Sequence, residues 1–188
     1  MGKHEVSAGS RAVFLDRDGV INRPLVRDGK PYPPVSLEEF ELLPGVAEAC
    51  QLLKQHDFWL VVATNQPDVG RGTLSASVVE AIHARMCELL PIDRVEVCYD
   101  PGQGIPSEFR KPAPGMLLRA ARELGIDLTQ SYMVGDRWRD IDCGAAAGCA
   151  TIFINYGYAE ELRQTPHFQA SSLLEAAHII TRPYEKHR

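Results

Sequence analysis

The sequence predicts an α/β domain: a doubly wound, Rossmann-like parallel sheet with helices on both faces. Short apolar runs alternate with longer stretches in which apolar residues recur every three or four positions. This is the pattern of strands that alternate with helices. The runs are apolar throughout, as in strands that are buried on both faces. Polar residues directly follow several runs, so a ligand site is expected at the carboxyl edge of the sheet.

Five strands are expected, each of them a short apolar run: Arg11–Leu15, Trp59–Ala63, Val95–Cys98, Tyr132–Val134 and Thr151–Ile154. Right-handed crossovers between parallel strands place the helices on both faces of such a sheet. No Gly-x-Gly-x-x-Gly fingerprint is present, so a dinucleotide is not implied.

Helices are expected between and after the strands: after Pro44-Gly45, after Ser75, after Pro114, from Asp140 to Ala147 and from about Ser172 to Ile180. Ser75 is expected to cap the second of these, with Ser77 and Glu80 as an alternative capping box. Three stretches with turn residues and little apolar periodicity are interpreted as loops: 23–44, 68–72 and 99–112. The first is expected to lie over the carboxyl end of the sheet.

Composition indicates one soluble domain. The chain has 188 residues, of which 45% are hydrophobic and 24% charged. Residues 1–10 are expected to form a flexible tail and residues 11–188 a single domain, with no large cap domain. The net charge is -5 and no basic stripe stands out, which argues against a nucleic-acid partner. No apolar run is long enough to span a membrane.

The five cysteines are scattered and form no Cys-x-x-Cys pair, as is typical of reduced thiols in a cytoplasmic protein. The six histidines fall at none of the strand ends and are interpreted as surface or packing residues. Their positions are 4, 56, 83, 167, 178 and 187.

The first strand is followed by Asp16 and Asp18, two carboxylates close in sequence. Like charges at this distance repel unless a cation or a proton lies between them. An Asp-x-Asp sequence at a strand end is therefore a candidate Mg²⁺ site with a possible nucleophile. The plainer interpretation is an Asp-Gly turn that ends a strand.

Polar residues also follow other strands and precede a helix: Thr64, Asn65, Asp136, Asp140 and Lys111. In one parallel sheet these ends lie on the same edge, so the side chains can converge. Carboxylate oxygens suit Mg²⁺, and a lysine with a cation can neutralise a phosphoryl group. Taken singly, Thr64 can simply end a strand, Lys111 can be a solvated charge and Asp140 can cap its helix. The combination is more specific than any one residue.

These motifs resemble those of the haloacid dehalogenase-like (HAD) phosphohydrolases over nearly the whole chain. The signature positions occur in order: Asp16-Arg17-Asp18-Gly19, Thr64, Lys111, and Gly135-Asp136 with Asp140. More narrowly, residues 16–22, 64–66, 110–116 and 132–136 look like those of the D-glycero-D-manno-heptose 1,7-bisphosphate phosphatases. The related histidinol-phosphate phosphatases share most of these motifs.

The resemblance implies a role for each residue. Asp16 would be the nucleophile and a Mg²⁺ ligand. Asp18 would be the general acid and then the base, and would give the metal its main-chain carbonyl. Asp136 would be the third protein ligand. Thr64 and Lys111 would hold the phosphoryl oxygens.

Substrate contacts are implied for four residues: Asn65, Gln66, Arg110 and Arg137. The heptose enzymes usually carry a zinc loop, Cys-x-His followed by Cys-x-Cys before Arg-Lys-Pro. Here only Cys98 of those ligands remains. One thiolate cannot form a four-coordinate site, so no structural zinc is expected.

The expected function is that of a Mg²⁺-dependent phosphatase that forms an aspartyl-phosphate and acts on a small sugar phosphate. The leading substrate is D-glycero-D-manno-heptose 1,7-bisphosphate, and the expected assembly is a monomer or a small homo-oligomer. Histidinol phosphate or another small phosphomonoester is the nearest alternative. A phosphotransferase such as a mutase, or a non-catalytic binding protein, is an alternative of another class.

Overall fold

A computed structural model describes residues 9–27, 30–158 and 160–182 of the chain. Its centre is a six-stranded sheet in the order β5-β4-β1-β6-β7-β8, in which every neighbouring pair is parallel. The strands are β1 (Arg11–Leu15), β4 (Phe58–Asn65), β5 (Arg94–Cys98), β6 (Tyr132–Gly135), β7 (Ala150–Ile154) and β8 (Phe168–Ala170). Strand order therefore reverses between β1 and β6, as in a Rossmann-like sheet.

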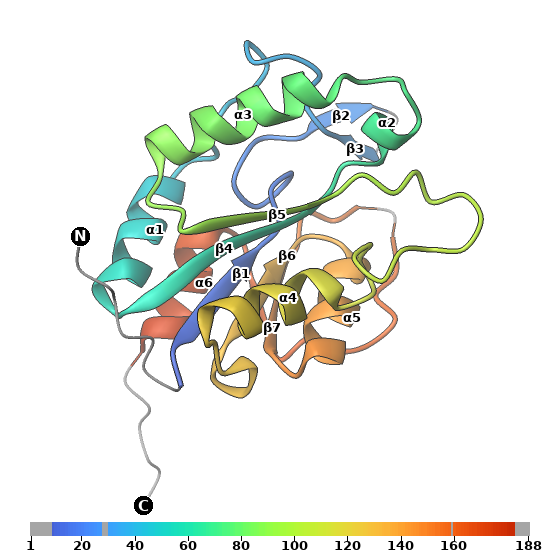
Figure 1. The fold of residues 1–188 in the computed structure, drawn as a ribbon. Coiled ribbons are helices and arrows are strands. Elements are labelled where there is room, and N and C mark those ends of the chain that lie inside the picture. Colours follow the sequence, from blue (N-terminus) through green and yellow to red (C-terminus); the bar gives the residue numbers. More distant parts are fainter. Residues whose placement is uncertain (1–8, 28–29, 159, 183–188) are drawn as a thin grey trace, which may run out of the picture.

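Helices cover both faces of this sheet (Figure 1). The helices are α1 (Val46–Gln55), α2 (Pro67–Gly70), α3 (Ala76–Leu89), α4 (Gly115–Leu124), α5 (Trp138–Ala147) and α6 (Leu173–Thr181), with a 3-10 turn at Leu128–Gln130. α1, α3 and α6 pack on one face, and α4 and α5 pack on the other. The doubly wound architecture expected from the sequence is confirmed.

The central strand shows why these residues form a buried parallel sheet. Successive side chains of a strand point to opposite faces. Val13 and Leu15 pack against α1 and α6, whereas Ala12 and Phe14 pack against α4 and α5. All four are fully buried, so the strand is apolar at every position rather than at alternate ones.

The structure corrects several boundaries. The stretch 23–44, expected as a loop, contains an antiparallel hairpin of β2 (Leu25–Arg27) and β3 (Lys30–Tyr32). The stretch 68–72 overlaps α2, and β8 was not expected. The helix expected from Asp140 begins at Trp138. The elements that were not expected, β2, β3, α2 and β8, have only three or four residues each, too few for a periodicity to be recognised.

The tail expected at residues 1–10 lies mostly outside the described residues. Its last two residues are described. Ser10 forms a β-bridge with Ile126, and the Ser10 carbonyl accepts a hydrogen bond from the Asp127 N–H. All five cysteines are free thiols. Within the described ranges, no helix combines the length and the apolar character that a membrane span requires.

Candidate active site

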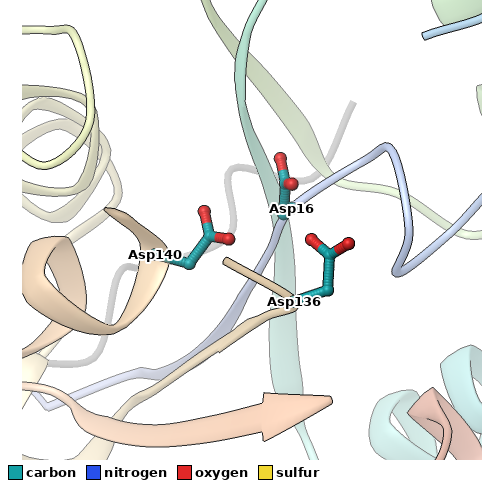
Figure 2. A group of neighbouring side chains, drawn as sticks. All are labelled: Asp16, Asp136 and Asp140. Atoms are coloured by element: carbon teal, nitrogen blue, oxygen red, sulfur yellow. The ribbon is translucent and has the colours of Figure 1, made fainter. Parts of the chain in front are cut away.

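Three carboxylates meet at the carboxyl end of the sheet (Figure 2). Asp16 follows β1, Asp136 follows β6, and Asp140 lies in the first turn of α5. One oxygen from each lies within 4.8 Å of the others. We call these three residues the carboxylate cluster. It lies where the strand order reverses, which is where open α/β sheets bind ligands.

Two glycines allow the backbone to come this close. Gly19 has φ +92°, and a Cβ at this position would lie 2.1 Å from Oδ2 of Asp136. A Cβ on Gly135 would lie 2.1 Å from the Cβ of Asp140. Any larger residue at either position would displace a member of the carboxylate cluster. Steric exclusion therefore explains why each motif contains Gly at this position.

Lys111 links two members of the cluster. Its ammonium lies 2.8 Å from Oδ1 of Asp16 and 2.5 Å from Oδ1 of Asp140, and the side chain is buried. Burial alone would lower the pKa of Lys111, but the Asp140 and Asp16 carboxylates outweigh it and raise that pKa. Lys111 is therefore a fixed positive charge. The other oxygen of Asp140 accepts the Arg137 N–H at 3.1 Å, so Asp140 does cap its helix.

Asp136 has no such partner. Both of its carboxylate oxygens are buried, and neither has a hydrogen-bond partner of normal geometry among the described residues, although the Tyr158 hydroxyl lies near the carboxylate. Burial, and then the charges of Asp16 and Asp140, raise the pKa of Asp136 well above its ordinary value. Buried carboxylates without donors are costly unless they are paired or coordinate a metal. The donor set of Asp16 and Asp136 therefore fits a hard divalent cation such as Mg²⁺.

Burial also raises the pKa of Asp16 to about 7, and the Lys111 ammonium opposes this effect. The charges of Asp140 and Asp18 raise it further. Since a carboxylate must be ionised to attack phosphorus or to bind a metal, a cation beside Asp16 would favour the reactive form.

Asp18 lies across the turn from the carboxylate cluster and faces the same cavity. Its Oδ1 accepts a hydrogen bond from Asn22 at 3.0 Å, and its Oδ2 accepts one from Gln66 at 2.8 Å. Arg17 contacts both oxygens. Gln66, expected to touch substrate, is buried and instead holds Asp18 and the hydroxyl of Thr64.

Asn65 holds the main chain of Lys111. Its amide nitrogen donates to the Lys111 carbonyl at 3.0 Å, and its amide oxygen accepts from the Lys111 N–H at 3.1 Å. Thr64 is buried and is not among the residues that line the cavity. The sequence motif Thr64-Asn65-Gln66 thus supports the site mainly by positioning Lys111 and Asp18.

The cavity above the cluster has a volume of about 330 Å³. Its floor contains Asp16, Asp18, Lys111, Asp136 and Asp140, and its walls include the expected Asn65, Arg110 and Arg137. Six other wall residues were not expected from the sequence: Tyr32, Pro33, Pro67, Asp68, Arg71 and Arg139. Arg139 could have been predicted as a site residue, since it lies only three positions after Asp136 at the start of a helix.

Comparisons with known proteins agree with this geometry. Residues 108–176 match the family model described as HAD-hydrolase-like. The chain is 35% identical to the D-glycero-D-manno-heptose-1,7-bisphosphate 7-phosphatase of Thermosynechococcus vestitus, over 85% of this chain and 86% of that protein. It is 38% identical to the D-glycero-beta-D-manno-heptose-1,7-bisphosphate 7-phosphatase of Escherichia coli K12, over 74% of this chain and 76% of that protein.

A solved structure is also similar. The D,D-heptose 1,7-bisphosphate phosphatase from B. bronchiseptica, complexed with magnesium and phosphate, superimposes with a TM-score of 0.75 at 29% identity and covers 90% of this chain and 97% of that one. The chain therefore belongs to the HAD-like phosphatases, the family of phosphoric monoester hydrolases that includes the D-glycero-D-manno-heptose-1,7-bisphosphate 7-phosphatases.

Proposed function

We propose that this chain is a Mg²⁺-dependent phosphatase that hydrolyses a small sugar phosphate bearing a second anionic group. D-glycero-D-manno-heptose 1,7-bisphosphate, the compound in the names of its relatives, is the leading substrate. One observation carries the proposal: a single cavity has a carboxylate floor suited to a metal-assisted phosphoryl transfer and walls that carry four arginines.

These four residues form an arginine rim: Arg71, Arg110, Arg137 and Arg139. Near them lie two carboxylates. Asp68 pairs with Arg71, and Glu160 pairs with Arg137 and lies 3.6 Å from Arg139. The pKa of Arg139 is lowered by burial and by the neighbouring cations, against the opposing effect of Glu160. Positive charge is therefore in surplus at the rim, and guanidinium groups bind phosphate well.

The first chemical step uses Asp16 as nucleophile. An Asp16 oxygen forms a bond to phosphorus as the bond from phosphorus to the sugar oxygen breaks. Asp18 donates its proton to the departing sugar oxygen. The Lys111 ammonium, fixed by Asp16 and Asp140, stabilises the negative charge on the transferring phosphoryl oxygens.

The second step reverses the use of Asp18. It now accepts a proton from water, whose oxygen forms a bond to phosphorus as the bond to Asp16 breaks. The products are inorganic phosphate and the original carboxylate of Asp16. Asp16, Asp136 and the main-chain carbonyl of Asp18 would hold the Mg²⁺. Once bound, the cation would neutralise charge on the phosphoryl group.

The loop 99–112 supports the expectation that no structural zinc is bound. Cys98 is buried at the end of β5. Asp100 accepts hydrogen bonds from the N–H groups of Gly102 and Ser107, and its carbonyl accepts one from Arg110. These hydrogen bonds link the two ends of the loop and tie Arg110 to Asp100. Elemental analysis of the purified protein should find substoichiometric zinc, and one tightly bound zinc per chain would contradict this.

The substrate is tested by phosphate release in the presence of Mg²⁺. The panel contains both anomers of D-glycero-D-manno-heptose 1,7-bisphosphate, histidinol phosphate and several hexose monophosphates. We expect a strong preference for one heptose bisphosphate anomer. A preference for histidinol phosphate would overturn the substrate assignment but leave the reaction type in place. No Mg²⁺-dependent release from any ester would overturn the proposed function.

A further inference from the structure

Arg17, the residue between the two aspartates of the first motif, is buried completely. Its carbonyl oxygen accepts backbone N–H groups from the turn that follows, so its main chain is fixed. Its Nη2 lies 3.0 Å from both carboxylate oxygens of Asp18, and its Nε lies 3.3 Å from Oδ1. The guanidinium therefore holds the carboxylate by both oxygens, an arrangement with strong geometric specificity.

Two further hydrogen bonds fix the orientation of the Asp18 carboxylate. Asn22 donates to Oδ1 and Gln66 donates to Oδ2. The carboxylate cannot rotate without breaking several of these bonds. The side chain is nevertheless 17% exposed and lines the cavity, so it remains accessible to a substrate.

His83, on the buried face of α3, meets the far side of Arg17. Its Nε2 lies 3.2 Å from Nη1 of Arg17. A guanidinium has only N–H groups to offer, so the imidazole must accept, which requires a neutral ring with its hydrogen on Nδ1. Burial, and then the charge of Arg17, lower the pKa of His83 to about 4. The ring is therefore neutral at pH 7 and can serve as the acceptor.

We infer that Arg17 is a positioning residue for Asp18, and that neutral His83 fixes the Arg17 guanidinium for this task. The inference rests on the proposed function, in which Asp18 transfers a proton in each step. A group that first gives a proton to the sugar oxygen and then takes one from water must keep its place throughout. Without His83, Nη1 of Arg17 would be buried without a partner, at a cost in free energy.

A buried ion pair can also be purely structural, and leaving-group dependence separates the two roles. Benzyl phosphate releases an alcohol, which needs a proton from the enzyme. 4-Nitrophenyl phosphate releases a stable phenolate, which needs almost none. The measured quantity is kcat/KM, because it covers the steps up to formation of the phosphoenzyme. Loss of positioning should affect the benzyl ester, whereas a damaged fold should affect both esters equally.

The test compares His83→Leu, which removes the acceptor, with His83→Gln, which restores one. His83→Leu should lower kcat/KM for benzyl phosphate about 10-fold, a part of the roughly 10²–10⁴-fold that general acid–base catalysis supplies. It should change the value for 4-nitrophenyl phosphate by less than about 2-fold, since little proton transfer is needed there. His83→Gln should recover most of the loss, and His178→Leu, at an exposed position of α6, should change neither ester.

Arg17→Lys keeps the charge but not the planar fork, and should show the same selective loss to a larger degree. If it fails to fold, the His83 variants still decide the matter. Equal losses on both esters, or no rescue by Gln, would overturn the positioning role and leave the phosphatase intact. If the wild-type chain releases phosphate with Mg²⁺ from neither these two esters nor any sugar phosphate of the substrate panel, the proposed function fails and takes this inference with it.

Discussion

Single residues determine whether the carboxylate cluster can form. Asp136 lies beside Gly19 so closely that no side chain fits between them. The same glycine has a positive φ, so two independent constraints act at this one position. The motif Asp-x-Asp-Gly is thus explained by the approach of a second strand end rather than by the turn alone.

Gly19→Ala should lower Mg²⁺ affinity and kcat at least about 10-fold, because displacing the surroundings of a metal ligand has effects of this size. The left-handed backbone should in addition destabilise the fold by about 1–2 kcal/mol. Gly148→Ala is the matched control, since Gly148 has φ +87° with no atom near the added Cβ. It should lose stability but keep its activity. Equal activity losses in both variants would contradict this explanation.

Arg110 belongs to the arginine rim, where the second anionic group is expected. Arg110→Ala should raise KM for a sugar bisphosphate by about 10- to 100-fold, since a charge-assisted hydrogen bond contributes about 1.5–3 kcal/mol. The KM for 4-nitrophenyl phosphate, which has no second phosphate, should change little. Arg85→Ala serves as a control, because Arg85 pairs with Glu88 on the exposed face of α3. Matching KM increases for both substrates would remove Arg110 from substrate recognition.

The sequence predicts the residues of the site where their position follows from strand ends. Asp16 and Asp136 converge because parallel strands bring their carboxyl ends to one edge, and Lys111 joins them from the loop between β5 and α4. Two kinds of residue could not be predicted. Arg71 looks like an ordinary solvated charge until the walls of the cavity are known. His83 looks like a packing residue on a helix face, and only the partner from another element, Arg17, shows what it contacts.

At the scale of elements, α3 is the helix that brings His83 to the site, and its start is fixed by Ser75. The Ser75 hydroxyl accepts the Ser77 N–H, so the expected cap is confirmed in preference to the alternative box at Ser77 and Glu80. Ser75→Ala should destabilise the protein by about 1 kcal/mol, which is a fall in Tm of roughly 2–4 °C. Ser77→Ala should change Tm by less. The reverse ranking would contradict the assignment of the cap.

Elements with a continuous apolar run or a periodic apolar face were predictable, and the three-residue strands were not. β1 and β4 have apolar runs that only a central strand explains. β8 has three residues, of which two are exposed, and it is a strand because it pairs with β7. The β2–β3 hairpin likewise exists through its own pairing, and Tyr32 from it reaches the cavity wall. Pairing of this kind is a tertiary effect, which a local pattern does not encode.

At the scale of the whole molecule, the sheet places like charges together at its carboxyl edge. Repulsion between these carboxylates destabilises the metal-free fold, and a bound cation should reduce that repulsion. Saturating Mg²⁺, at about 100 times its Kd, should stabilise the protein by about 2.7 kcal/mol, or roughly 5–10 °C in Tm. Thermal melts with Mg²⁺ and with EDTA check this. Identical Tm values would contradict a Mg²⁺ site in the carboxylate cluster.

The stability of the metal-free protein should also depend on pH, because burial and repulsion raise the pKa of a carboxylate in the cluster. The pKa of Asp16 is raised from 3.8 to about 7, so between these values the folded state binds more protons than the unfolded state. Stability therefore falls as pH rises through this window. Mg²⁺ competes with those protons, so the Mg²⁺-induced rise in Tm should be larger at pH 8 than at pH 5.5. A rise that shrinks with pH would contradict the assignment of the raised pKa.

The central claim is that Asp16 carries the phosphoryl group, and trapping the phosphoenzyme tests it most directly. Wild-type protein and the Asp18→Asn and Asp16→Asn variants are quenched in acid during turnover of 4-nitrophenyl phosphate with Mg²⁺, digested and examined by mass spectrometry. We predict one hydroxylamine-sensitive phosphoryl group on Asp16, more abundant in Asp18→Asn because water then lacks its base, and none in Asp16→Asn. Turnover that survives Asp16→Asn, or a phosphoryl group on another residue, would contradict the account.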